Sequence, residues 1–84
     1  MISVDPQKYK LSKRINLKKG PSGLFVVIDR KSRVIMKDAH RILKIANQIK
    51  TIEPDIKIGV FSTAPVCSKT KVFLSDNNLH ITLK

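Results

Sequence analysis

The sequence predicts a small α/β fold built on a mixed, partly parallel sheet. The run Leu24–Ile28 is continuously apolar and rich in β-branched residues, which is typical of a buried central strand. The stretch Ile56–Ile81 follows the order strand, polar loop, helix, strand. An amphipathic helical pattern separates the two, and helices that alternate with buried strands favour parallel pairing through right-handed crossovers. With 84 residues, the chain has room for one small domain.

Positive charge is the strongest compositional feature of the chain. Seventeen Lys and Arg residues stand against six acidic ones, which gives a formal net charge of +11. Twelve of the seventeen lie within residues 1–44. Such an excess predicts a polyanionic partner, and in a small domain it favours RNA or DNA over an anionic membrane surface or a basic surface that binds nothing specific.

Cysteine content and hydropathy indicate the cellular compartment in which the protein is expected. The single cysteine, Cys67, excludes an internal disulfide and fits a reducing compartment. No apolar run approaches the length of a membrane span, so we expect no membrane insertion. The N-terminal MISVDPQKYK lacks the apolar region of a secretory signal. A cytoplasmic location is expected, and the oligomeric state stays open.

Residues 1–23 are expected to form a basic N-terminal arm or an edge strand, and residues 24–84 the α/β domain. The segment Lys8–Lys19 is dense in positive charge, and its apolar residues suit a helix and a strand about equally. Gly20–Gly23 breaks the chain before the first strong strand.

The middle of the chain predicts a short hairpin and then a helix. After the polar turn Asp29–Arg33, Val34–Met36 is expected to return as an antiparallel strand. Asp38 is expected to cap a helix whose apolar face recurs as far as Ile49. Glu53–Asp55 ends this helix, because the residue before a proline avoids the helical region.

The last third predicts strand, helix and strand. Apolar residues alternate from Ile56 to Val60. Thr63 and Pro65 indicate a helix start, since a hydroxyl caps free N–H groups and proline is tolerated in the first turn. Asn residues at 77 and 78 favour a helix end, and the segment 79–83 forms the closing strand.

A basic surface is the first candidate site. It begins on the predicted turn and continues along the first helix, where Lys37 and Arg41 oppose the positive end of the helix dipole. The sequence keeps these two cations despite their unfavourable interaction with the helix dipole, which favours a role in contacting phosphates. The alternative is an ordinary solvated helix face. Its candidate RNA-binding residues are Arg30, Lys31, Arg33, Lys37, His40, Arg41 and Lys44.

The loop from Ser62 to Lys71 is the second candidate. Ser62, Thr63 and Lys69, next to a helix N-terminus, are ingredients of an anion site, although the Walker spacing is missing and plain capping explains them too. Cys67 is the third candidate. A thiol at a helix start near lysines has a lowered pKa and acts as a nucleophile, but the second cysteine of thioredoxin-like motifs is missing, which favours a buried core residue.

Other chemistry has little support in the sequence. The His, Asp and Glu residues show no metal-ligand spacing, so we expect no metal and no cofactor. With six acids in the chain, paired-carboxylate catalysis is disfavoured, and no enzyme activity is predicted. Phe25, Phe61 and Phe73 are assigned to the core, which leaves Tyr9 as the exposed aromatic and makes stacking on single strands unexpected.

Two motifs carry a family resemblance that spans Leu24 to Ile81. They are Met36-Lys37-Asp38 at the first helix and the run Ala64-Pro65-Val66-Cys67-Ser68-Lys69-Thr70. With them, the region resembles the Pelota-type RNA-binding domain, a branch of the superfamily that contains the kink-turn-binding ribosomal proteins. The Gly-x-Asn-Glu-x-x-Lys pattern of the kink-turn readers is replaced here by Met36-Lys37-Asp38-Ala39-His40-Arg41.

The resemblance implies a three-layer α-β-α sandwich that binds RNA without catalysis, through the regions corresponding to Lys37–Lys44 and Ser62–Lys69. Pelota-type modules also occur fused to phosphoribosyltransferase-like enzymes, so association with a larger enzyme is open. The leading hypothesis is a small module for structured RNA. The alternatives are a thiol-dependent, thioredoxin-like enzyme or redox protein that uses Cys67, and an adaptor that uses the basic arm.

Overall fold

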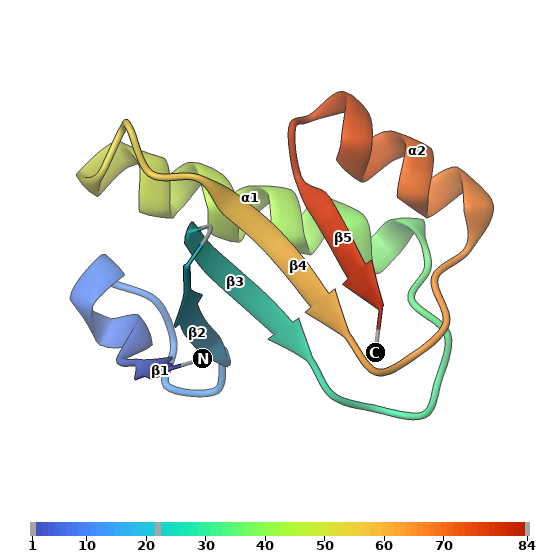
Figure 1. Ribbon diagram of the computed structural model, residues 1–84, viewed down its shortest axis with the longest axis horizontal. Coiled ribbons are helices and arrows are strands. Elements are labelled where there is room, and N and C mark those ends of the chain that lie inside the picture. The colour runs from blue at the N-terminus through green and yellow to red at the C-terminus, as the bar shows by residue number, and fades with distance from the viewer. Residues whose placement is uncertain (1, 22, 84) are drawn as a thin grey trace.

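The computed structural model describes residues 2–21 and 23–83 as a sheet with two α-helices packed against it (Figure 1). The elements in chain order are β1 (Ile2–Val4), the 3-10 helix η1 (Pro6–Tyr9), β2 (Leu17–Gly20), β3 (Gly23–Ile28), α1 (Met36–Ile52), β4 (Ile58–Ser62), α2 (Ser68–Asp76) and β5 (His80–Leu83). The five strands lie side by side in the order of the sequence. β1, β2 and β3 pair antiparallel, whereas β3, β4 and β5 pair parallel. The predicted α/β class and mixed sheet are confirmed.

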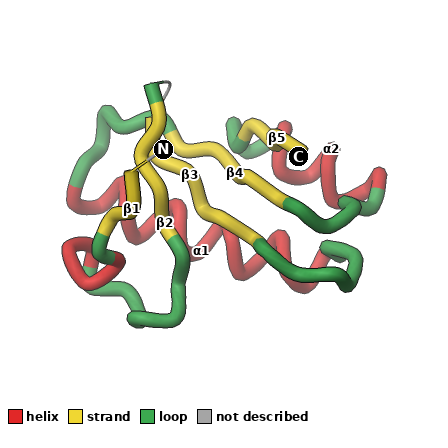
Figure 2. The backbone as a smooth tube through the Cα atoms, turned by 60° about the horizontal axis from the view of Figure 1, so that its bottom comes forward, coloured by secondary structure: helices red, strands yellow, loops and turns green. Residues whose placement is uncertain are grey.

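Both helices lie on the same face of the sheet (Figure 2). The crossover from β3 to β4 through α1 and the crossover from β4 to β5 through α2 step across the sheet in the same direction. Right-handed crossovers in one direction place their helices on one side. The helices therefore touch, and the rings of His40 on α1 and Phe73 on α2 have centroids 4.8 Å apart. Within the described residues the sandwich has two layers in place of the expected three, because no crossover reverses direction.

The covered face of the sheet forms the hydrophobic core. Leu24 and Val26 of β3, with Ile58 and Val60 of β4, are buried against the helices. From α1 the core takes Ala39, Ile42, Ile45, Ala46 and Ile49, and from the last third of the chain it takes Leu74 and Leu79. Burial of a Val, Leu or Ile side chain stabilises by about 1.5–3 kcal/mol, so this face holds the two layers together.

Residues 2–20 belong to the same sheet and core. β2 is an inner strand between β1 and β3, and its Leu17 is buried. Tyr9 was expected to be exposed, but its side chain is buried, with 2% of its surface exposed. Its hydroxyl donates to the carboxylate of Glu53. The Nε2 group of Gln48 donates to the carbonyl of Tyr9 at 3.0 Å. These contacts pack η1 against the C-terminal half of α1.

The predicted hairpin after β3 is wrong. Val34 makes a single parallel bridge to Val66, and α1 already begins at Met36, with Ile35 in the extended N-cap position. Asp38 lies inside the first turn, where its carboxylate accepts the N–H of Ile35 at 3.0 Å. Asp38 therefore supports the helix start from within the first turn instead of preceding it.

The predicted start of the second helix is also wrong. β4 continues to Ser62, and α2 begins at Ser68 with Cys67 as its N-cap, because residues 63–67 bond to the neighbouring loop instead of opening a helix. The predicted helix end is confirmed at Asp76, and Asn78 adopts a left-handed conformation with φ of 61°. In the part of the chain that the structure describes, no helix has the length and apolar character needed to span a membrane.

Candidate nucleic-acid interface

Two loops meet at the carboxyl edge of the parallel strands. One is residues 29–35 after β3, and the other is residues 63–67 after β4. The N–H of Val34 donates to the carbonyl of Pro65 at 2.9 Å, and the N–H of Cys67 donates to the carbonyl of Val34 at 3.1 Å. The two candidate regions, which are far apart in sequence, thus form one continuous surface, as the ends of neighbouring parallel strands do in α/β proteins.

Arg30 shapes the first of these loops. Its guanidinium donates to the carbonyls of Ser32 and Arg33, each at 3.2 Å, and forms a salt bridge with Asp38 on α1. The hydrogen bond from Arg30 is the main cause that lowers the pKa of Asp38 below its ordinary value. The side chain of Arg30 is 37% exposed, so it can still meet an anion, but its donors are largely used within the protein.

The hydroxyl groups of the last residue of β4 and of the residue after it form hydrogen bonds within the two loops. Ser62 is fully buried, and its hydroxyl donates to the carbonyl of Ala64 at 2.9 Å and accepts the N–H of Ala64 at 3.1 Å. In this conformation Ser62 has no access to a ligand. Thr63 is exposed, and its hydroxyl donates to the carboxylate of Asp29 at 3.0 Å, which links the two loops. Thr63 therefore remains at the surface as a candidate contact.

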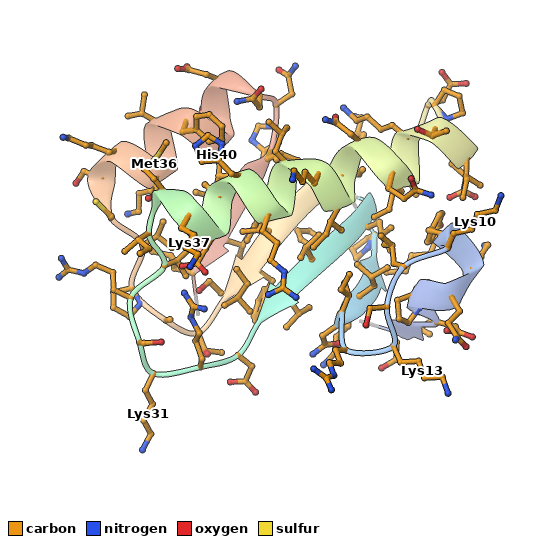
Figure 3. All side chains as sticks on the ribbon, turned by 180° about the vertical axis from the view of Figure 1, so that it is seen from behind. Lys10, Lys13, Lys31, Met36, Lys37 and His40 are labelled. Atoms are coloured by element: carbon orange, nitrogen blue, oxygen red, sulfur yellow. The ribbon has the colours of Figure 1, made fainter. Side chains whose placement is uncertain are left out.

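Four exposed cations project from this edge and make no salt bridge with a described residue: Lys31, Arg33, Lys37 and Lys69. We call them the basic rim. Lys31 points away from the molecule at the tip of its loop, and Lys37 lies at the start of α1 (Figure 3). Cations that make no salt bridge within the protein can neutralise the phosphates of a nucleic acid. Their binding then releases the counterions that were condensed on the nucleic acid.

The exposed side of α1 extends the basic rim. Arg41 and Lys44 follow Lys37 at spacings of four and three residues, which places all three on neighbouring turns of one helix side. His40 has a different role, because its ring packs against Phe73 of α2 at an interplanar angle of 59°. His40 is therefore a contact between the helices as well as a candidate RNA contact.

A cleft of about 460 Å³ lies between α1, the end of β3 and residues 14–16. Arg14, Arg30 and Arg41 are among the residues that line it, over an apolar floor made of Val26, Ile28, Ile42 and Ile45. Arg14 was not among the residues proposed from the sequence. It reaches this place only because the N-terminal segment folds beside α1, and its sole signal in the sequence is the basic pair Lys13-Arg14.

Cys67 lies half-buried at the start of α2 and is not a core residue. Hydrogen bonding from the backbone N–H groups of Lys69 and Thr70 lowers the pKa of the Cys67 thiol. Thr70 is fully buried, and its hydroxyl has no hydrogen-bond partner among the described residues. The thiol is thus reachable and has a stabilised thiolate form.

The acidic residues of this edge are used within the fold. Asp29 accepts from Thr63, and Asp38 accepts from Arg30 and Ile35. Across residues 2–21 and 23–83, no group of three or more His, Cys, Asp or Glu side chains is placed to hold a metal ion. The chemistry that the edge offers is therefore mainly that of cations and one thiol.

No protein-family model, curated protein or solved structure matches this chain in the comparisons made. The resemblance to the Pelota-type domain stays a prediction.

Proposed function

We propose that this protein is a small non-catalytic RNA-binding module that recognises structured RNA through the basic rim and the exposed side of α1. The observation that carries the proposal is the joining of the two loops by the bonds of Val34 to Pro65 and Cys67, which gathers Lys31, Arg33, Lys37 and Lys69 on one edge. Arg30 balances the charge of Asp38, and the four cations of the basic rim outnumber the remaining acid, Asp29, so the edge has an excess of positive charge.

A folded RNA is the partner that best suits this edge. Lys37, Arg41 and Lys44 are spaced along one rigid helix, and rigidly spaced cations suit the regular phosphates of a helical RNA. The exposed hydroxyl of Thr63 can add a contact to a phosphate or a 2′-OH. This partner also agrees with what the Pelota-type resemblance implies.

A salt titration tests the proposal. Affinity for an RNA hairpin, measured by fluorescence anisotropy, is expected to fall linearly in a plot of log K against log salt concentration. The double variant Lys31→Ala/Lys37→Ala is expected to reduce the slope by about 1.5–2, because two phosphate contacts are lost. Absence of binding at low salt would overturn the proposal.

The matched control removes equal charge from the other end of the molecule. Lys10 and Lys13 are exposed on the N-terminal segment, away from Lys31 and Lys37 (Figure 3). The variant Lys10→Ala/Lys13→Ala is expected to keep the slope. An equal loss in both double variants would show that net charge, not the basic rim, binds the RNA. A loss confined to the control would show that the N-terminal segment, not the basic rim, contacts the RNA.

The position of Cys67 favours a second candidate function, a thiol-dependent activity. The accessible thiol with its lowered pKa is suited to attack an electrophile. The pH dependence of alkylation by iodoacetamide, compared between the protein and free cysteine, checks it. A thiol pKa at or above the free value of about 8.5 would exclude activation.

A further inference from the structure

The face of the sheet opposite the helices carries aromatic side chains that no described element covers. Phe25 and Phe61, expected in the core, are half-buried on this open face. The strand register gives the side chains that share the face from β2 to β5: Lys18, Phe25, Gly59 and His80 in one row, and Val27, Phe61 and Thr82 in the next. With both helices on the other side, nothing in the described fold explains why aromatic rings occupy this surface.

Gly59 allows the ring of Phe25 to lean across β4. A Cβ atom at Gly59 would lie 2.9 Å from ring carbon Cε1 of Phe25 and 3.1 Å from Cδ1, closer than side chains tolerate. The ring of Phe25 therefore lies over the backbone of the neighbouring strand at Gly59. An aromatic surface that is already positioned loses little conformational entropy when a flat ligand stacks on it.

Two lysines lie near Phe25 on the open face. A hollow of about 700 Å³ runs beside Phe25 and is bordered by Lys57, His80 and Thr82. Lys18 lies next to Phe25 on the neighbouring strand. None of the described strand residues on the open face is Asp or Glu. The strand residues of this face thus combine a stacking surface with nearby lysines, and the acidic Asp29 follows the end of β3, where it accepts a hydrogen bond from Thr63.

We propose that this open face binds an unpaired stretch of RNA, with bases stacked on Phe25 and Phe61 and phosphates near Lys18 and Lys57. Phe25 pairs with Gly59 and Phe61 pairs with Val27, so the two phenylalanines are diagonal neighbours on adjacent strands. Aromatic side chains on the central strands of an open sheet stack two or three bases of single-stranded RNA. The inference rests on the proposed function for the class of partner, but it concerns a separate surface.

A second copy of the chain fits this face poorly. In a two-fold dimer the same patch meets itself, which would bring Lys18 and Lys57 of both copies together. The chain already carries a net charge of +11, and such repulsion opposes the contact.

The test compares two RNA probes by fluorescence anisotropy: an unstructured ten-nucleotide strand and a hairpin. Phe25→Leu and Phe61→Leu keep apolar volume and remove the aromatic face. Each is expected to weaken single-strand binding by about tenfold and to leave hairpin binding unchanged. Phe73→Leu, which alters a half-buried ring on α2, is the matched control and is expected to leave single-strand binding unchanged.

A spectroscopic measurement makes the result independent of any loss of stability. The chain contains no Trp, so Phe61→Trp introduces a single reporter. Stacking of a base is expected to quench its fluorescence when the unstructured strand is added, and not when the hairpin is added. Melting curves confirm that each variant is folded at the temperature used.

The outcomes separate the two proposals. Hairpin binding without single-strand binding, or Leu variants that bind the single strand as well as the parent, would overturn this inference and leave the basic rim intact. Binding of the single strand alone, lost in the Leu variants, would support this inference and overturn recognition of structured RNA. A dimer in sedimentation experiments that Phe61→Leu dissociates would overturn it in favour of a second copy.

Discussion

The guanidinium of Arg30 and the carboxylate of Asp38 form a salt bridge that fastens the loop after β3 to the first turn of α1. Arg30 also holds the carbonyls of Ser32 and Arg33. One side chain thus closes the loop that displays Lys31 and Arg33. The pair links the stability of the helix start to the shape of the basic rim.

Asp38→Asn is expected to destabilise the protein by about 1 kcal/mol at neutral pH, because it removes the salt bridge and weakens the bond from Ile35, both partly screened by solvent. The pKa of Asp38 is lowered in the folded state, so its contribution is present above the ordinary value of 3.8 and lost as the pH falls through the folded pKa. The difference between parent and variant in urea unfolding should therefore narrow in acid. Asp55→Asn, at an exposed turn residue, is the control and should change little.

Tyr9→Phe is expected to flatten the loss of stability in alkali. Burial, with the hydrogen bond to Glu53 and its charge, raises the pKa of Tyr9 from 10.0 to about 12. The stabilising contribution is therefore complete below pH 10 and is lost as the pH rises toward 12. The chain has one Tyr, so absorbance of the tyrosinate reports this group alone. Ionisation with the ordinary pKa in the folded protein would contradict the packing of η1 on α1.

Ile49→Ala and Ile52→Ala form a matched pair on α1. Ile49 is fully buried, whereas Ile52 is 40% exposed. We expect Ile49→Ala to cost about 2–5 kcal/mol of unfolding free energy and Ile52→Ala less than about 1 kcal/mol. Chemical denaturation measures both. Similar losses would mean that α1 buries a different face.

Gly23→Ala is expected to destabilise the turn between β2 and β3 by about 2 kcal/mol or more. Gly23 has a φ of 138°, and an added Cβ would collide with the carbonyl oxygen of Lys57. Thermal melting should show a shift of roughly 8 °C or more. Because the obstacle is backbone, adding Lys57→Ala should not rescue the variant, and a rescue would contradict the geometry.

The sequence predicted the elements whose pattern reflects burial. The apolar run in β3, the helical spacing in α1 and the alternation in β4 each arise from local contact with the core, so they are visible without the fold. The starts of the two helices were not predicted correctly. They depend on hydrogen bonds of Val34 with Pro65 and Cys67 across the sheet edge, and a local sequence pattern does not reveal such long-range bonds. The direction of the crossovers, which determines the number of layers, is likewise a property of the whole chain.

The candidate site was predicted as a set of residue types and not as an arrangement. Exposure of Lys31, Lys37 and Lys69 follows from charge alone. The hydroxyl of Ser62 forms a hydrogen bond with the carbonyl of Ala64 inside the protein, and capping rules did not predict this bond. Phe25 looked like a core residue because it lies in a continuous apolar run, which is typical of a strand covered on both faces, whereas both helices lie on one face of this sheet.

Strand β3 also determines the order in which the sheet can assemble. On one side it meets β2 through the short turn that joins Gly20 to Gly23, and on the other Leu24 pairs with Ile58, on the far side of α1. Local contacts form quickly, whereas a parallel pair must wait for its crossover to fold. We therefore expect the N-terminal strands to form a three-stranded template from nearby residues, and the docking of α1 onto this template to limit the rate of folding. Mutations in the buried face of α1 should slow folding, and mutations in β5, which joins the finished edge of the sheet, should mainly speed unfolding.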